Sequence, residues 1–288
     1  MFLDPISYFK KNYIGKKTGY IMPIKGIDIE KCINCKQCVR ECPGVVFEIN
    51  EVEDFVVFNR TKMCINCGHC ISVCPEDAII YKNMKDEPLI FEGVRDLSTI
   101  ISYDQIDQYI RAKRSIRQYK KKKIPKEIME KVINSMRYAP TGGNLRQLKC
   151  LILSDDEKIK NLSQLIQNEM ASLIGTYINP LNEKKALGID PIFHNAPHVI
   201  ILYSNVPLDT VNADIAMTHA MICAPTLGLG TCWIGFAQFL SQNKEIRKNF
   251  LGIQGKILAA MTIGYPAVKY TRTAPRPPFK VIGLEELE

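Results

Sequence analysis

The sequence lacks long uninterrupted runs of apolar residues. No stretch of its 288 residues approaches the ~18 consecutive apolar side chains typical of a membrane-spanning helix, so we expect no membrane span. The first residues, MFLDPISYFKKNYIGKK, contain neither a long apolar segment nor a small-residue cleavage site, so we expect no secretory signal and a cytoplasmic protein. Tracts dominated by glycine or proline are also missing, which excludes collagen-like and low-complexity classes.

Two common enzyme signatures are missing as well. The sequence contains no G-x-G-x-x-G dinucleotide fingerprint. None of its histidines (His69, His194, His198 and His219) stands in a Ser/His/Asp or Cys/His motif. We therefore expect the histidines to be structural or surface residues, and we assign no catalytic side chain.

Positive charge is concentrated in one short segment of the chain. The formal net charge is +8, and the basic residues of this segment are Arg111, Lys113, Arg114, Arg117, Lys120, Lys121, Lys122, Lys123 and Lys126. Basic runs can bind nucleic acid, but this one lacks the interleaved aromatic residues that stack on bases. We expect the lysines to form solvated surface, with no nucleic-acid partner.

Eight of the eleven cysteines fall into two runs with the same spacing. The runs are Cys32-x-x-Cys35-x-x-Cys38-x-x-x-Cys42-Pro43 and Cys64-x-x-Cys67-x-x-Cys70-x-x-x-Cys74-Pro75. Three cysteines two residues apart let one loop bind three irons of a cubane iron–sulfur cluster, while the fourth ligand comes from elsewhere. A zinc ribbon would use paired C-x-x-C knuckles, and disulfides are rare in a reducing cytoplasm.

The two runs and their surroundings, about sixty residues, resemble bacterial-type ferredoxins that hold two [4Fe–4S] clusters. In such ferredoxins the fourth cysteine of each run binds the other cluster. The resemblance therefore predicts one cluster on Cys32, Cys35, Cys38 and Cys74, and a second on Cys64, Cys67, Cys70 and Cys42. The other cysteines, Cys150, Cys223 and Cys232, are expected to be small buried hydrophobic residues.

Composition and periodicity divide the chain into four segments: an N-terminal extension (1–24), the cysteine-rich domain (25–85), a linker (86–104) and an α and β domain (105–288). In the last segment, apolar residues at helical spacing predict helices over 128–136 and 155–173, an apolar helix over 213–227 and a helix near 244–250. Short apolar, β-rich runs predict strands over 148–153, 199–203, 231–234 and 257–263.

The last segment also resembles the nitroreductase family of FMN enzymes. The matching pieces occur in the family's order over about 170 residues. They are RAKRSIRQY (Arg111 to Tyr119), YAPTGGNLRQ (Tyr138 to Gln147), NAPHVIILY (Asn195 to Tyr203), GLGTCWIG (Gly228 to Gly235) and GYP…PRPP (Gly264 to Pro278). The resemblance implies an α+β fold, with a mixed sheet flanked by helices, and a homodimer that binds FMN at the subunit interface.

The resemblance also assigns the residues that would bind the FMN phosphate. They are Lys113, Arg114, Ser115 and Arg117 near the start of the domain and Arg276 in the tail. Arginine suits this role because its planar guanidinium offers a fork of donors to phosphate oxygens. Ala274 stands where the family has a further basic residue, and Arg272 is the candidate to replace it.

Two other segments would contact the flavin ring. Pro140, Thr141, Gly142 and Asn144 lie in a turn that approaches the flavin in the family, with the asparagine at the ring edge. Arg146 stands where the family usually has glutamine, and a cation there would favour anionic reduced flavin. Trp233, Ile234 and Gly235 follow a glycine-rich turn, and the backbone N–H near Gly235 would face flavin N5, which tunes the cofactor.

Together the two resemblances predict an oxidoreductase. Electrons would pass from an external low-potential donor, such as reduced ferredoxin, through two clusters to FMN and then to a nitroaromatic, quinone or similar small acceptor. Two alternatives stay open: an electron-transfer or redox-sensing protein that acts on a protein partner, and an FMN enzyme that removes a substituent such as halide reductively. Turnover of acceptor panels and release of halide distinguish the three.

Overall fold

The computed structural model describes residues 22–91, 96–174, 179–206, 209–236, 243–284 and 287. Apart from residues 22–24, the predicted N-terminal extension lies outside the described residues. The chain forms two compact units. The first comprises Met1–Gly93 together with two later segments, Ala139–Lys149 and Ser204–Ile215, and the second comprises the rest. Segments far apart in the sequence therefore belong to the same unit as the cysteine runs.

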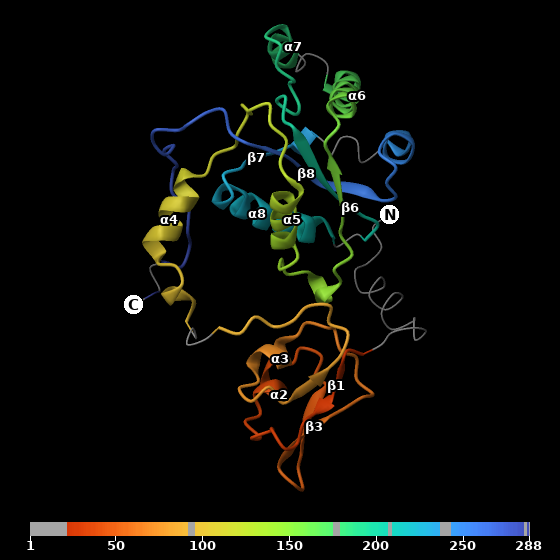
Figure 1. Ribbon diagram of the computed structural model, residues 1–288, viewed down its shortest axis with the longest axis vertical. Helices are drawn as coiled ribbons and strands as arrows, with labels where there is room; N and C mark the ends of the chain where they lie inside the picture. Colours follow the sequence, from red (N-terminus) through yellow and green to blue (C-terminus); the bar gives the residue numbers. More distant parts are fainter. Residues whose placement is uncertain are drawn as a thin grey trace. The chain divides into compact units, whose positions relative to one another are not determined.

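The cysteine-rich part of the first unit is built from short strands and two short helices (Figure 1). In chain order these are β1 (Ile24–Ile27), α2 (Gln37–Glu41), β2 (Phe47–Asn50), β3 (Phe55–Phe58), α3 (His69–Val73) and β4 (Ile79–Tyr81). β1 pairs with β4 and β2 pairs with β3, both antiparallel. The third cysteine of each run lies in one of the two helices and the fourth directly follows it, so the sequence repeat is also a structural repeat.

The repeat extends to backbone conformation. Asn34 and Asn66 occupy equivalent positions and have φ values of 55° and 57°. Lys36 and Gly68, the residues before α2 and α3, also lie in the left-handed region, with φ values of 61° and 78°. Left-handed residues turn the chain sharply, and here they wind each run so that its cysteines face inward. The cysteines Cys38, Cys64 and Cys70 are buried among Val46, Phe47 and their neighbours.

The remaining part of the chain combines helices with one four-stranded sheet. Its helices are α4 (Tyr103–Ala112), α5 (Lys126–Met136), α6 (Asp156–Ile174), α7 (Asn179–Ala186) and α8 (Asp209–Thr226), with a π-helical turn at Ile246–Phe250 and short 3-10 helices at Leu97–Thr99 and Gly142–Asn144. Its strands are β5 (Lys149–Leu153), β6 (His198–Ser204), β7 (Gly230–Trp233) and β8 (Lys256–Gly264). They are ordered β5-β6-β8-β7, and β7 and β8 are antiparallel.

The core of the second unit lies around the two central strands. β6 is buried along nearly its whole length, and β8 is buried at every position after Lys256. Leu162 and Ile166 of α6 belong to the same core and are fully buried. Apolar runs of this kind belong to central strands that are covered on both faces, so the strands predicted over 199–203 and 257–263 are confirmed.

Cys150 was wrongly predicted to be buried. It lies on β5, an edge strand of the sheet, and its side chain is exposed. An edge strand is covered less completely than a central one, which the local sequence does not reveal. Cys232 on β7 is buried as predicted, and Cys223 is half-buried.

The predicted helix over 213–227 is α8, which begins four residues earlier, at Asp209, and ends at Thr226. Its buried apolar residues are Ala213, the adjacent pair Ala216 and Met217, Ala220 and Ala224, and this spacing of about one helical turn places them on one face. Val211 is 63% exposed, so the helix is not buried all round in the single chain. No helix in the described part of the chain is long and apolar enough to cross a membrane.

Besides the short helices α2 and α3 of the cysteine-rich part, two longer helices were not predicted. α4 begins at Tyr103, where Ser102 and Gln105 form a reciprocal capping box, a motif that satisfies free N–H groups at a helix start. α7 has almost no segregation of apolar and polar faces in its sequence, NPLNEKKA. A helix without such a periodic signal is not detectable from apolar spacing.

Candidate functional site

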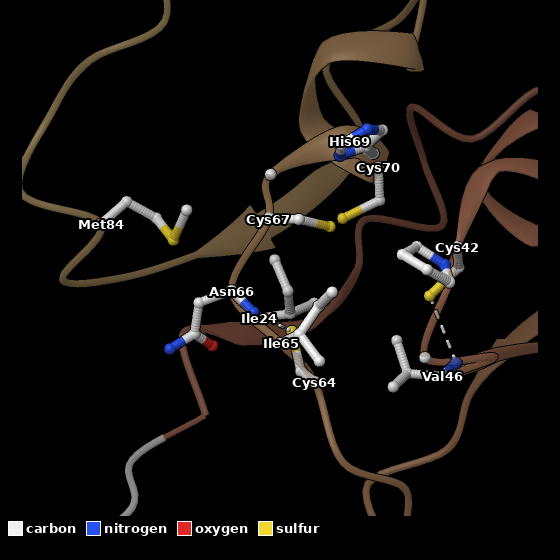
Figure 2. Close-up of a pocket in the computed structure, with 13 residues that line it drawn as sticks. Ile24, Cys42, Val46, Cys64, Ile65, Asn66, Cys67, His69, Cys70 and Met84 are labelled. Atoms are coloured by element: carbon white, nitrogen blue, oxygen red, sulfur yellow. Dashed lines mark hydrogen bonds between the residues drawn. The ribbon is translucent and has the colours of Figure 1, made fainter. Parts of the chain in front are cut away.

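Four cysteines from both runs line one cavity in the first unit. Cys64, Cys67 and Cys70 come from the second run, and Cys42 is the last cysteine of the first. Figure 2 shows their side chains directed toward a common space, with Met84 and His69 at its border. We call these four cysteines the second set.

A second cavity has the complementary composition. Cys32, Cys35 and Cys38 line it together with Cys74, the last cysteine of the second run. We call these four cysteines the first set. The structure thus groups the eight cysteines as the sequence predicts, three from one run and the fourth from the other. That they bind iron stays a prediction.

The chemistry of both sets fits a positively charged iron–sulfur core. Burial, together with the neighbouring Cys64, Cys67 and Cys42, raises the pKa of Cys70 to about 12. Burial and the neighbouring cysteines likewise raise the pKa of Cys38 to about 11. Thiolates are the form that binds metal, so four of them in one cavity need positive charge nearby, which iron would supply.

The thiols surround these cavities and do not converge on a point. In the described ranges, no three His, Cys, Asp or Glu side chains meet closely enough to hold a single metal ion. A cubane cluster carries one thiolate on each iron, so its ligands must be spread around a volume. The arrangement of the two sets has this property.

Backbone N–H groups donate to several of the sulfur atoms. The backbone N of Val46 lies 3.4 Å from Cys42 Sγ, and that of Ala78 lies 3.2 Å from Cys74 Sγ. Each repeat therefore contains the equivalent hydrogen bond. A third donor is the N–H of Asn66, 3.4 Å from Cys64 Sγ. Hydrogen bonds to the sulfurs help to set cluster potentials.

The predicted phosphate residues lie beside β7 in the second unit. The N–H of Ile116 donates to Thr231 O at 2.9 Å, which aligns residues 113–117 with that strand. Arg114 donates from Nη2 to Arg111 O at 3.0 Å. In the described part of the chain, Arg114 Nε and Thr231 Oγ1 are buried without a hydrogen-bond partner. Because buried polar groups are normally paired and both of these atoms can donate a hydrogen bond, they fit a bound acceptor such as a phosphate ester.

Further cations surround the same part of β7. Burial raises the pKa of Cys232, while Arg117, Lys113 and Lys184 act in the opposite direction. Burial lowers the pKa of Lys113, as expected for a cation without an anion beside it. Lys184 belongs to α7, and sequence reasoning missed it because nothing in the sequence predicted that helix.

Among the predicted flavin residues at the end of β7, Gly235 borders open space. Trp233 is the last residue of β7, and the N–H of Ile234 donates to Ala260 O at 2.8 Å. A Cβ placed on Gly235 would meet no atom within 4 Å. The open space at Gly235 would let a flat ligand approach the backbone.

The C-terminal tail contains the predicted arginines. Tyr270 Oη donates to Ser115 O at 3.4 Å, which places the start of the tail at the predicted phosphate residues. Arg272 and Arg276 are exposed, and the role of each at a phosphate stays a prediction.

The turn that contains Pro140, Thr141, Gly142, Asn144 and Arg146 belongs to the first unit. Asn144 Nδ2 donates to Ile65 O at 2.9 Å and to Asn66 O at 2.8 Å, and Asn144 Oδ1 accepts from Arg146 Nε at 2.9 Å. This carboxamide was predicted at a flavin edge, and sequence reasoning did not detect its contact with the second cysteine run. No residue pattern marks such a contact.

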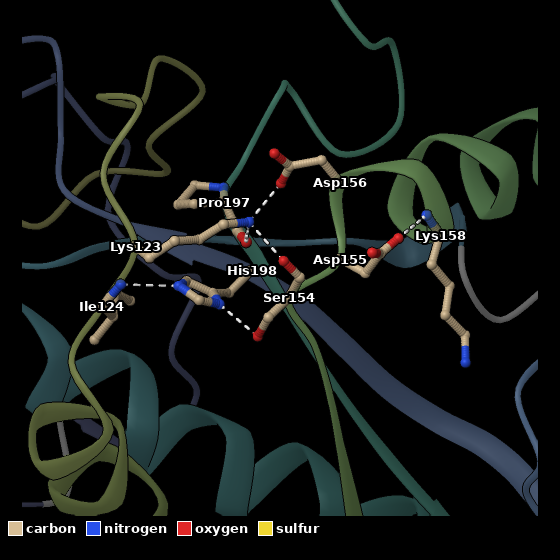
Figure 3. A network of polar contacts seen from close by, with 8 residues as sticks. All are labelled: Lys123, Ile124, Ser154, Asp155, Asp156, Lys158, Pro197 and His198. Atoms are coloured by element: carbon tan, nitrogen blue, oxygen red, sulfur yellow. Dashed lines mark hydrogen bonds and ion pairs between the residues drawn. The ribbon is translucent and has the colours of Figure 1, made fainter.

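His198 belongs to a polar network that contains a serine and an aspartate (Figure 3). Its Nε2 accepts from the N–H of Ile124 at 2.9 Å, and its Nδ1 lies 2.8 Å from Ser154 Oγ. Nε2 therefore carries no proton, so in the neutral ring Nδ1 carries the proton and donates a hydrogen bond to Ser154 Oγ. Asp156 pairs with Lys123 and not with the imidazole. In this tautomer His198 cannot take a proton from Ser154, and the structural role expected for the histidines stays a prediction.

Comparisons with known proteins match the cysteine-rich part and the later part of the chain separately. Residues 31–79 match a model described as a 4Fe-4S dicluster domain. An FMN reductase [NAD(P)H] of Bacillus subtilis is 25% identical over 181 residues, covering 60% of this chain and 70% of that protein.

Two solved structures share the fold of the later part of the chain. A nitroreductase with bound FMN from Bacteroides fragilis has a TM-score of 0.53 at 20% identity, covering 62% of this chain and 98% of that one. A nitroreductase with bound FMN from Desulfitobacterium hafniense has a TM-score of 0.51 at 15% identity, covering 59% of this chain and 93% of that one. Residues 110–265, more than half of the chain, match the nitroreductase family model, so this chain belongs to the nitroreductase family.

Proposed function

We propose that this chain is an FMN-dependent reductase that receives its electrons through two [4Fe–4S] clusters. The observation that carries the proposal is the presence of two complete cysteine sets in the same chain as a nitroreductase-family region. When bound, clusters exchange single electrons and a flavin accepts one at a time and delivers two, so the combination suits a two-electron reduction fed by a one-electron donor.

The first and second sets would each hold one cluster through four thiolates. Their buried members, Cys38, Cys64 and Cys70, would keep the iron in an apolar setting, and the backbone N–H donors would stabilise the thiolates. We propose a reducing compartment such as the cytoplasm for this protein, because disulfides rarely persist there and thiols stay available.

The FMN phosphate would be bound by the cations beside β7. Arg114 has a buried Nε free to donate, and Lys113 and Arg117 contribute charge nearby. The hydroxyl of Ser115 and the tail arginine, Arg276, would complete the set. The loop with Thr141, Gly142 and Arg146 and the backbone at Gly235 would face the ring, in agreement with the family resemblance.

We propose a homodimer, in line with the family resemblance. Apolar side chains that a single chain leaves exposed support this proposal: in the tail, Phe279 is 93% exposed and Ile282 is 98% exposed, and in α4, Ile110 is 56% exposed. Exposed apolar surface of this kind is typical of residues that become buried in an interface. Sedimentation or light scattering of the reconstituted protein measures the oligomeric state directly.

The proposed donor is reduced ferredoxin or a similar low-potential protein, and the proposed acceptor is a nitroaromatic, a quinone or a similar small molecule. The test uses anaerobically purified protein with its iron, acid-labile sulfide and FMN quantified. Flavin reduction is then followed with reduced ferredoxin and with NADH, in the wild type and in a variant whose eight cluster cysteines are serine.

The proposal expects reduction by ferredoxin in the wild type only. Rapid stoichiometric reduction of the cluster-free variant by NADH would refute the need for the clusters. Turnover of a nitroaromatic and quinone panel with the same donor tests the reductase activity itself. Halide release from halogenated aromatics would instead favour reductive removal of a substituent.

A further inference from the structure

A single asparagine contacts the backbone of the second cysteine run. Asn144 uses both protons of its amide group, donating to Ile65 O at 2.9 Å and to Asn66 O at 2.8 Å. Ile65 and Asn66 lie between Cys64 and Cys67, two ligands of the second set. All of these residues belong to the first compact unit.

One of the two acceptors, the carbonyl of Ile65, belongs to a peptide group whose N–H donates a hydrogen bond to a cysteine sulfur. The carbonyl of Ile65 accepts from Asn144, and the N–H of the same peptide group, on Asn66, donates to Cys64 Sγ at 3.4 Å. A hydrogen bond to a peptide carbonyl polarises the group and strengthens its N–H as a donor, by about 10–30% per bond. Asn144 therefore acts on Cys64 Sγ through one intervening peptide.

The asparagine is itself held in place. Its Oδ1 accepts from Arg146 Nε at 2.9 Å, so the amide group points its protons at the cysteine run. The N–H of Gly142 donates to Asn212 Oδ1 at 3.1 Å, and Asn212 donates in turn to Asp209 Oδ1 at 2.8 Å. Asn212 and Asp209 are buried, so these hydrogen bonds hold the turn against ordered side chains at the start of α8.

The first set has a different environment at the equivalent position. Ile33 corresponds to Ile65 in the repeat and is 62% exposed, whereas Ile65 is half-buried. Asn34, the counterpart of Asn66, donates from its side chain to Asp54 O at 2.6 Å, a contact within the cysteine-rich segment. The two sets are therefore equivalent in sequence spacing but not in surroundings.

We propose that Asn144 is a positioning residue that strengthens the N–H donor to Cys64 Sγ and so raises the reduction potential of the cluster held by the second set. This inference rests on the proposed function, because it requires that the second set holds a cluster. A stronger donor to the sulfur favours the more negative, reduced cluster, so the potential rises. The second set is then the better electron acceptor of the two through this contribution, and it is the set that the predicted flavin loop contacts.

The test measures the potential of each cluster in the full-length, cluster-loaded protein by redox titration monitored by electron paramagnetic resonance. Cys38→Ser and Cys70→Ser assign the two signals to the first and second sets. Asn144→Leu keeps the size of the side chain and removes both donors. We expect the ratio of reduced to oxidised second cluster at a fixed solution potential to fall about tenfold, which is about 59 mV for a one-electron couple.

Asn144→Asp provides a nearly isosteric second variant. It also loses both donors and adds a negative charge, so the same cluster should shift further in the same direction. The matched control is Asn168→Leu on α6, whose amide interacts with Gln164 outside the cysteine-rich segment. Neither signal should shift in that control, and the first cluster should not shift in any of the three variants.

The outcomes separate this inference from the proposed function. If the wild type contains iron and sulfide for two clusters but both Asn144 variants leave the second potential unchanged, or shift both clusters equally, the inference is overturned. If the wild type shows no cluster signal at all, the proposed function is overturned instead. Iron content, flavin content and circular dichroism verify that each variant is folded before its potential is compared.

Discussion

Gly44 lies directly against the backbone of Met63. A Cβ placed on Gly44 would stand only 2.8 Å from Met63 O, closer than real Cβ atoms approach. Gly44 follows Cys42-Pro43, and Met63 precedes Cys64, so this contact joins the ends of the two segments that bring Cys42 and Cys64 to the same cavity. The close approach of these segments depends on the missing side chain at position 44.

Replacing this glycine should disturb the second set. Gly44→Ala forces the Met63 backbone to move, and overpacking of this kind costs about 1–3 kcal/mol. We expect a lower free energy of unfolding in denaturant and a lower iron-to-protein ratio. Glu51→Ala is the control, because Glu51 is exposed and lines neither cysteine cavity. Equal iron content in both variants and the wild type would contradict the prediction.

The last cysteine of each run lines the cavity of the other run, and this exchange predicts which cluster each cysteine affects. Cys74 lies in the second run but lines the cavity with Cys32, Cys35 and Cys38. Cys74→Ser should therefore change the same electron paramagnetic resonance signal as Cys38→Ser and leave the signal lost in Cys70→Ser intact. Cys150→Ser, which alters an exposed thiol outside both sets, should keep both signals. A Cys74→Ser spectrum that resembles that of Cys70→Ser would disprove the exchange of the last cysteines between the two sets.

Arg114 should contribute strongly to FMN affinity. Its buried, unpaired Nε would gain a charge-assisted hydrogen bond, worth about 1.5–3 kcal/mol. Arg114→Met should therefore raise the FMN dissociation constant on the order of 10- to 100-fold, measured by quenching of flavin fluorescence on reconstitution. Lys121→Met removes an exposed cation of the same basic run and should leave the constant unchanged. Equal affinity in the two variants would place the phosphate elsewhere.

Acid should destabilise the second unit through His194. Burial, with help from Lys184 and Arg117, lowers its pKa from 6.5 to about 4. Since the unfolded chain binds the proton first, stability present above about pH 6.5 is lost as the pH falls toward 4. The loss is at most about 3 kcal/mol.

His194→Asn tests this effect, because asparagine tolerates the left-handed backbone of this position, where φ is 57°. Denaturant unfolding between pH 7 and pH 4 should show a shallower decline in the variant than in the wild type. Parallel curves would mean that other groups cause the acid sensitivity.

The sequence was informative where chemistry depends on local spacing. The spacing of each cysteine run predicts three members of a set from one loop, and the exchange of the fourth cysteine was predicted from the resemblance to two-cluster ferredoxins. Strands such as β6 were predictable for a related reason, since a central strand is apolar at nearly every position. The segment around Arg114 was found through its similarity to a family.

The parts that escaped prediction depend on contacts between distant segments. Lys184 comes near His194 and Cys232 only because α7 forms, and α7 has no apolar periodicity. The exposure of Cys150 follows from the place of β5 at the sheet edge, which depends on the order of all four strands. The hydrogen bonds of Asn144 to the second cysteine run join residues 78 and 79 positions apart, and no local pattern reports such a distance.

Unequal burial of the two cysteine sets has a consequence for handling the protein. Only Cys38 is buried in the first set, whereas Cys64 and Cys70 are both buried in the second. Dioxygen and peroxide reach exposed thiolates and their iron more readily. During brief contact with air, the first set should therefore lose iron sooner, and a preparation aged in this way would contain a half-loaded form with an intact second set.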